Sequence, residues 1–156
     1  MAFTIVKHKQ LNKHDPENGV WGDCERTAFA CFTGEHPSWV PHWNDGYGVT
    51  RDDDEANRIF HEWLDRKMLF TVSIGLYQPD LDFEGAMKFG SSLTQPDIPW
   101  ILGGESPRGF GHVVIVQNGE MLWDPTSEYH TGLAGPHPAD DKGDARWAYI
   151  YVGERP

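Results

Sequence analysis

The 156-residue chain is predicted to have an α+β fold, with helices early and antiparallel strands late. Two of the observations behind this prediction are apolar residues at helical spacing, over residues 23–32 and again over residues 53–67. The third is an Asn118-Gly119 pair between two apolar runs, which is a strong sequence signal for a β-hairpin. Because 156 residues can bury a sizeable core, we expect a single domain over residues 1–156.

The N-terminal half is expected to contain one strand and two helices. The segment "FTIV" (residues 3–6) predicts a short strand, which is followed by a polar loop with proline and glycine. The helix over residues 23–32 starts with Asp23, a favourable N-cap, and ends before Gly34, a favourable stop. The second helix, over residues 53–67, follows an irregular loop, and its acidic first turn suits the helix dipole.

The C-terminal half is expected to be mostly β-structure. A short helix is expected around residues 83–89, and a glycine- and proline-rich loop over residues 132–143. Strands are predicted, in chain order, for residues 68–77, for residues 98–104, for the hairpin 112–125 and for residues 146–153. This order of helices before antiparallel strands is what defines the predicted α+β class.

The composition excludes some classes of partner. Lys and Arg number 13 against 24 Asp and Glu, so the net charge of −11 repels phosphate backbones and we expect no nucleic-acid partner. No run reaches the ~18–20 apolar residues of a membrane span, so we expect no membrane association. The N-terminal stretch turns polar after six residues, unlike a secretory signal, and the expected location is cytoplasmic.

The two cysteines, Cys24 and Cys31, are expected to be free thiols. On one helix their Cα atoms would lie roughly 10 Å apart, which is too far for a disulfide. Cys31 is expected to be a structural residue of the helix core. No metal site is expected, because the histidines outside the catalytic candidates lack the short fixed spacing of zinc ligands. Those considered are His36, His42, His130 and His137.

Cys24, His112 and Asp124 are the residue types of nucleophilic thiol chemistry. Cys24 lies at a predicted helix N-terminus, which favours a thiolate, as does a nearby imidazolium. In the predicted hairpin, counting outwards from the turn pairs Val113 with Asp124. Asp124 should therefore lie beside His112, where a carboxylate can hold the imidazole tautomer and stabilise its charged form.

Three further residues are candidates for contacts with the reacting group or the substrate. A tetrahedral oxyanion needs donors, and we expect Asn18, six residues before Cys24, to supply its amide beside the Cys24 backbone N–H. Trp21 is expected to line a substrate cleft, and Arg108 to bind a substrate carboxylate. Each has a purely structural alternative, as a turn residue, a packed aromatic ring and a surface turn respectively.

The segments "NGVWGDC", "GHVVIV" and "LWDPTSEYHTGL" contain the chemical residues in chain order. With them the chain resembles papain-like cysteine peptidases, and among these the bacteriocin-leader (double-glycine) processing peptidases and small phage-encoded relatives. The resemblance implies a papain-like fold, with the nucleophile helix packed on an antiparallel sheet. It also implies these roles: Cys24 as nucleophile, His112 as general base, Asp124 as orienting residue and Asn18 in the oxyanion hole. The chain departs from the family in having asparagine instead of the usual glutamine at position 18.

The expected activity is that of a cysteine hydrolase, a peptidase or isopeptidase that cleaves a peptide or protein substrate through an acyl-enzyme, without a cofactor. An acyltransferase or deamidase with the same Cys-His-Asp triad is an alternative, because the fold does not determine the reaction. A second alternative is a catalytically silent phage or bacterial protein that binds a host factor through the aromatic loop over residues 39–47. The sequence indicates neither the substrate nor the oligomeric state.

Overall fold

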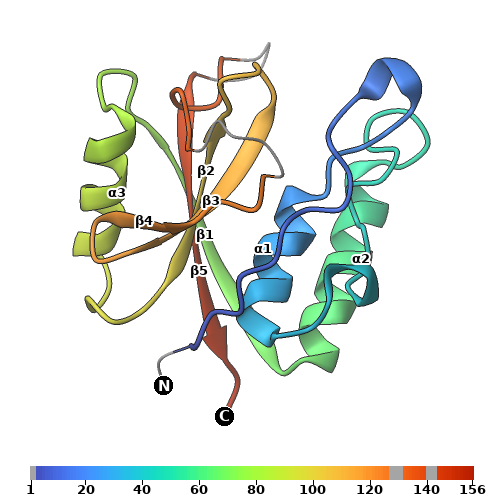
Figure 1. Ribbon diagram of the computed structural model, residues 1–156, viewed down its shortest axis with the longest axis horizontal. Coiled ribbons are helices and arrows are strands. Elements are labelled where there is room, and N and C mark those ends of the chain that lie inside the picture. The colour runs from blue at the N-terminus through green and yellow to red at the C-terminus, as the bar shows by residue number, and fades with distance from the viewer. Residues whose placement is uncertain (1–2, 127–131, 140–143) are drawn as a thin grey trace. The chain divides into compact units, whose positions relative to one another are not determined.

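The computed structural model describes residues 3–126, 132–139 and 144–156 of the chain. Within these residues it contains three α-helices and a five-stranded antiparallel sheet, which confirms the α+β class (Figure 1). The chain divides into two compact units, a helical unit (within residues 4–70, 125–126 and 153–156) and a sheet unit (residue 3 and residues within 71–124, 132–139 and 144–152). No helix of the described residues is long and apolar enough to cross a membrane. The expectation of one domain over residues 1–156 stays a prediction.

The helical unit contains both helices predicted from apolar spacing, α1 (Cys24–Thr33) and α2 (Asp53–Arg66). Two short 3₁₀ helices, η1 (Pro16–Asn18) and η2 (Pro37–Trp39), lie in the loops before and after α1. Rings with neighbouring centroids 4.7–5.9 Å apart form an aromatic core: Phe29, Trp43, Phe60 and Trp63. The predicted stop of α1 is confirmed, since Gly34 has a φ of 77° and closes the helix.

The strand predicted for residues 3–6 is wrong. This segment is irregular, and the Val6 N–H donates to the carbonyl oxygen of Cys31 at 3.0 Å. Cys31 lies in the last turn of α1, where a carbonyl has no partner within the helix. Val6 therefore satisfies a helix end instead of pairing with a strand. The apolar run over residues 3–6 carries no information about this partner, which lies far along the chain.

The sheet has the strand order β1-β5-β2-β3-β4 (Figure 1). Its strands are β1 (Leu69–Tyr77), β2 (Trp100–Glu105), β3 (Gly111–Gln117), β4 (Glu120–Trp123) and β5 (Arg146–Glu154). They confirm the strands predicted for the C-terminal half. The helix predicted around residues 83–89 is also confirmed, as α3 (Phe83–Ser92), which continues one turn further. The Asn118-Gly119 turn is confirmed as well, because both residues have the positive φ that a tight hairpin needs.

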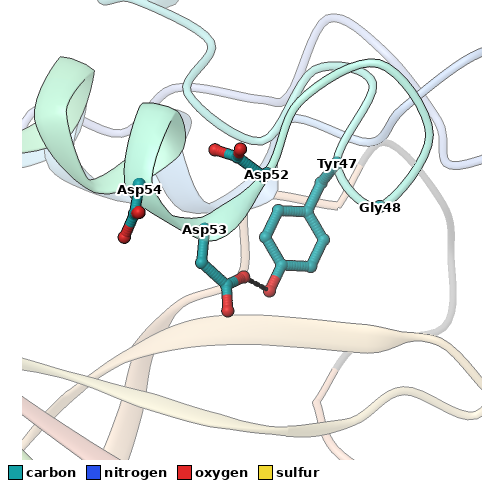
Figure 2. A pocket seen from close by; sticks show the side chains of 5 residues that line it. All are labelled: Tyr47, Gly48, Asp52, Asp53 and Asp54. Atoms are coloured by element: carbon teal, nitrogen blue, oxygen red, sulfur yellow. Dashed lines mark hydrogen bonds between the residues drawn. The ribbon is translucent and has the colours of Figure 1, made fainter.

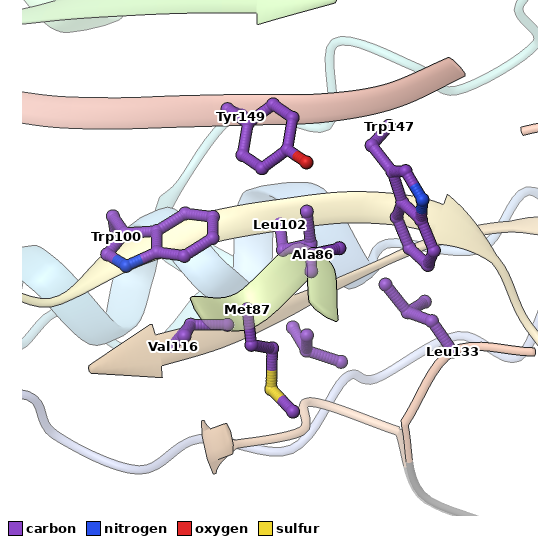
Figure 3. Close-up of a cluster of buried hydrophobic side chains, with 9 residues drawn as sticks. Ala86, Met87, Trp100, Leu102, Val116, Leu133, Trp147 and Tyr149 are labelled. Atoms are coloured by element: carbon purple, nitrogen blue, oxygen red, sulfur yellow. The ribbon is translucent and has the colours of Figure 1, made fainter. Parts of the chain in front are cut away.

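One face of the sheet packs against α3 in a buried apolar cluster (Figure 3). Its buried members are Ala86, Met87, Trp100, Leu102, Val114, Val116, Leu133, Trp147 and Tyr149. The Trp100 ring is held by a hydrogen bond from its Nε1 to the Ser91 hydroxyl, 3.0 Å long. A Cβ atom added at Gly90 would overlap this ring. The close approach of α3 to β2 therefore depends on a glycine in the last turn of the helix.

We expect Gly90→Ala to destabilise the protein by about 1–3 kcal/mol, because the added methyl group overpacks the Trp100 site. This sign is opposite to that of helix propensity, which favours alanine over glycine by about 1 kcal/mol. Urea unfolding measures the change. Gly135→Ala is the matched control, since a Cβ there meets nothing within 4 Å. Equal stability of the two variants would contradict the packing argument.

Candidate functional site

His112 and Asp124 form a buried pair in the sheet unit. The His112 Nε2 lies 2.7 Å from Asp124 Oδ1, and the residues are only 8% and 3% exposed. The second carboxylate oxygen, Oδ2, accepts a 2.6 Å hydrogen bond from the Gly132 backbone N–H. An ionised carboxylate only accepts hydrogen bonds, so Nε2 then carries the imidazole proton. Nδ1 is consequently the ring nitrogen that can take a proton in a reaction.

The expected proximity of Asp124 to His112 is confirmed, but the register that predicted it is wrong. The first pairs after the turn follow the predicted count, and then Ile115 pairs with Trp123. A β-bulge at this point gives β4 one extra residue, so Val113 is not the partner of Asp124. Asp124 follows Trp123, the last residue of β4, so the ladder does not dictate its direction. Among the described residues, its carboxylate is held instead by hydrogen bonds with His112 Nε2 and from the Gly132 N–H.

The strand pairing also fixes the side of the sheet on which His112 lies. In the antiparallel β2–β3 pair, His112 is opposite Gly104. Alternation along β3 places it on the face of Val114 and Val116, which pack in the cluster with α3. A Cβ at Gly104 would lie 2.7 Å from the Trp147 ring, so glycine is needed beside the histidine. His112 therefore lies at the start of β3, on the face that carries α3.

Cys24 is the first residue of α1 in the helical unit, as predicted, and its thiol is free and half-buried. Cys31 is also a free thiol but fully buried, and burial raises the pKa of its thiol. Its Sγ accepts a hydrogen bond from the His8 N–H at 3.4 Å, as suits a structural residue. The structure thus brings His112 and Asp124 together in one unit. That Cys24 reacts with them stays a prediction.

Asp23 occupies the N-cap position of α1, but its side chain does not cap the helix as predicted. The carboxylate is 1% exposed and accepts hydrogen bonds from the backbone N–H groups of Leu11 (3.3 Å) and Asn12 (2.8 Å). It also pairs with the Arg26 guanidinium at 3.0 Å, and Arg26 in turn donates to the Val40 carbonyl. The backbone N–H groups of Leu11 and Asn12 thus take the place of the local cap. Asp23 and its partner Arg26 therefore link the start of α1 to residues 11–12 and to Val40. The only sequence signal for this role is the i, i+3 spacing of the two opposite charges.

The other predicted site residues lie in loops. Asn18 ends η1, is exposed, and donates its side-chain amide to the Asp15 carboxylate at 2.7 Å, so its role in an oxyanion hole stays a prediction. Trp21 is half-buried, and its Nε1 donates to the Tyr47 carbonyl at 3.3 Å. Arg108 is exposed. His130, one of the histidines weighed as a metal ligand, lies outside the described residues.

A shallow pocket of about 470 Å³ lies at the start of α2 (Figure 2). It is lined by Tyr47, Gly48 and the three aspartates 52–54. Asp52 accepts a hydrogen bond from the Glu55 N–H and so caps α2, while the Tyr47 hydroxyl donates to the Asp53 carboxylate. Helix capping and this hydrogen bond account for the acidic run. Within the described residues no three His, Cys, Asp or Glu side chains group together as metal ligands would.

We expect Glu25→Gln to gain stability relative to the wild-type protein as the pH rises from about 4 to about 8. Burial raises the pKa of Glu25, despite hydrogen bonds from Asn44 and Trp43. Since the folded-state pKa exceeds the unfolded one, the contribution of Glu25 is favourable below the unfolded pKa and is lost as pH rises through the folded pKa. Urea unfolding across this range tests it. An equal effect at both ends of the range would contradict it, and Glu84→Gln at an exposed pair is the control.

We expect Asp23→Asn to cost about 3–5 kcal/mol, because it leaves the buried Arg26 guanidinium without its charge partner. Side chains in this pair are 0% and 12% exposed. The control is Glu62→Gln, which removes the exposed ion pair with Arg58 and should cost less than about 1 kcal/mol. Urea unfolding of both variants gives the comparison, and similar losses would show that Asp23 has no special structural role.

Comparison of the chain with protein-family models, with curated proteins and with solved structures finds no match. The candidate site is therefore supported by its own geometry and chemistry.

Proposed function

We propose that this protein is a cysteine hydrolase that forms an acyl-enzyme, with Cys24 as nucleophile, His112 as general base and Asp124 as the residue that orients His112. The single observation that carries the proposal is the buried hydrogen bond between His112 Nε2 and Asp124 Oδ1. A histidine held by a buried carboxylate has a defined tautomer and a stabilised cationic form, which general-base catalysis requires. The likeness of the sequence to papain-like cysteine peptidases supports the same assignment.

In the proposed reaction, His112 Nδ1 takes the proton of the Cys24 thiol, and the sulfur attacks the carbonyl carbon of an amide. The imidazolium then gives this proton to the leaving nitrogen, the C–N bond breaks, and an acyl thioester remains on Cys24. Water attacks the thioester while His112 accepts its proton. The S–C bond breaks, the acid leaves, and the proton returns to the thiol. Asp124 stabilises the imidazolium in both halves of the cycle.

Cys24 has the surroundings that this nucleophile needs. It begins a helix of ten residues, whose first backbone N–H groups have no partners within the helix. It is half-buried, which leaves the thiol open to a substrate, whereas Cys31 is sealed in the core. Of the two thiols, only Cys24 therefore combines access with a helix N-terminus.

The oxyanion donor has two candidates. Asn18 was expected from its spacing, yet its amide is bonded to Asp15. Gln10 is the second candidate, because Asp23 binds the next two residues and so holds this segment at the start of α1. Its side-chain Oε1, which only accepts, is buried without a hydrogen-bond partner among the described residues, so an oxyanion would be bound through Nε2 alone. Its Nε2 donates to the Asn12 carbonyl, a local bond that an oxyanion can replace.

The proposed substrate is a peptide or protein, and the proposed location is the cytoplasm, where free thiols persist. Trp21 and Arg108 are the proposed substrate contacts. The Arg108 guanidinium lies 5.3 Å from the centre of the Phe110 ring in the loop that precedes His112. This cation–π contact holds an exposed charge in one direction. An acyltransferase or a deamidase would use the same acyl-enzyme and differ only in the group that resolves it.

The proposal predicts an acylation burst with p-nitrophenyl acetate, an activated ester that needs no specific recognition. The ester should acetylate Cys24 Sγ and release p-nitrophenolate, and Cys24→Ala should abolish the burst. His112→Ala should slow acylation by about 10²-fold through loss of the base. Asp124→Asn should also slow it, through loss of the correct tautomer. Absorbance in a stopped-flow instrument measures the rates.

Cys31→Ala is the matched control, because that thiol is buried and should leave the burst intact. In the same assay, the larger loss among Gln10→Ala and Asn18→Ala identifies the amide donor. Acylation of His112→Ala at the wild-type rate would refute the triad. A protein that shows no burst, but binds partners through residues 39–47, would instead support the non-enzymatic alternative.

A further inference from the structure

Gly22, two residues before Cys24, is bound on both sides by histidines. Its backbone N–H donates to His14 Nδ1 at 3.0 Å, and its carbonyl oxygen lies 3.0 Å from His42 Nε2. The first bond fixes the peptide plane before Gly22, and the second fixes the plane after it. Because glycine has the freest backbone of all residues, these two contacts remove a rotation that the chain would otherwise make just before the nucleophile.

The two contacts require particular imidazole states. His14 must lack a proton at Nδ1 in order to accept from Gly22, whereas His42 must carry one at Nε2 in order to donate. Burial lowers the pKa of His42, and the positive charge of Arg26 acts in the same direction. The backbone hydrogen bond to Gly22 and the charges of Asp23 and Asp45 oppose this shift. The neutral form of His42 is therefore favoured, and a neutral ring that donates to the Gly22 carbonyl carries its proton on Nε2.

Gly22 itself is needed for this arrangement. A Cβ added there would lie 2.8 Å from the His14 Cβ and 3.1 Å from the His14 backbone nitrogen. Neither atom belongs to the flexible end of a side chain, so a larger residue would push the His14 segment away. Gly22, which precedes Asp23 and Cys24, thus allows His14 to pack closely against the backbone.

On the other side of Gly22, the chain is held by Asp23. Its carboxylate binds the backbone of residues 11 and 12, and its own N–H donates to the Asn12 carbonyl at 3.4 Å. The residues on either side of the Gly22–Asp23 peptide are therefore fixed by separate sets of partners. Cys24, which begins α1 directly afterwards, inherits its direction from these contacts.

We propose that His14 and His42 are positioning residues for Cys24: through Gly22 they fix the direction of the Cys24 thiol and backbone N–H. This inference builds on the proposed function, in which Cys24 is the nucleophile. Neither histidine touches the reacting atoms. Their effect is preorganisation, which removes the need to order the turn when the acyl-enzyme forms.

The test compares, at each histidine, a variant that removes the bond with one that keeps it. His14→Leu removes the acceptor, whereas His14→Asn keeps an acceptor oxygen near the place of Nδ1. His42→Leu removes the donor, whereas His42→Gln keeps an amide donor near the place of Nε2. The readouts are the rate of Cys24 alkylation by iodoacetamide, the p-nitrophenyl acetate burst and the melting temperature. His61→Leu, at an exposed position on α2, is the matched control.

We expect each leucine variant to lower the burst rate by about tenfold or more, as small misplacements of a reacting group do. The asparagine and glutamine variants should stay within about threefold of wild type, a rescue that loss of stability alone would not produce. The proposal is overturned if the leucine and amide variants react at the same rate, or if the rates simply follow the melting temperatures.

A measurement on the wild-type protein covers the case in which a leucine variant does not fold. The Gly22 amide should be protected from hydrogen exchange, and ¹⁵N spectra should show the Nε2–H tautomer for both histidines. An unprotected Gly22 amide overturns the proposal. If His112→Ala leaves the burst unchanged while His14→Leu slows alkylation and His14→Asn restores it, positioning stands and the triad fails.

Discussion

The buried carboxylate of Asp23 is the interaction on which the arrangement around Cys24 depends. A charge removed from water costs several kcal/mol unless it is paired and hydrogen-bonded. Asp23 meets this requirement with one guanidinium and two backbone N–H groups. The guanidinium belongs to Arg26 in the first turn of α1, and the N–H groups belong to Leu11 and Asn12. Residues 11 and 12 are therefore held at the start of α1. The chain between them and Gly22 forms a loop whose two ends are fixed.

In the sheet unit, the side chain that is held is the imidazole of His112, at the start of β3. Here backbone pairing alone is not sufficient, because Asp124 lies past the last residue of β4. The carboxylate is held by bonds to both of its oxygens, one from the imidazole and one from the Gly132 N–H. The two units therefore restrain Cys24 and His112, the proposed nucleophile and general base, by different means. Cys24 is directed by contacts to its backbone neighbours, and His112 by a contact to its ring.

Much of the fold could be predicted from the sequence, since its helices and strands carry local signals. Helical spacing indicated α1 and α2, and an Asn-Gly pair indicated the hairpin. The failures share a cause, which is a partner distant in the chain. Val6 bonds to a helix end, and the Asp23 carboxylate accepts from the N–H groups of residues 11 and 12 instead of capping its own helix. A β-bulge likewise leaves no mark in the apolar pattern from which the register was counted.

Some residues of the proposed site can be recognised in the sequence, and others cannot. A cysteine after a glycine turn and an Asp-Pro after a hairpin are visible because reactive groups need particular residue types. The role of His14 and His42 cannot be recognised in the sequence, because nothing there distinguishes them from other histidines in polar loops. Only the structure shows that their rings contact the Gly22 peptide groups. Such residues form hydrogen bonds with the backbone of a neighbour, which many polar side chains can do. What distinguishes them is their position in the folded chain. Placement is what the long-range contacts of the helical unit determine.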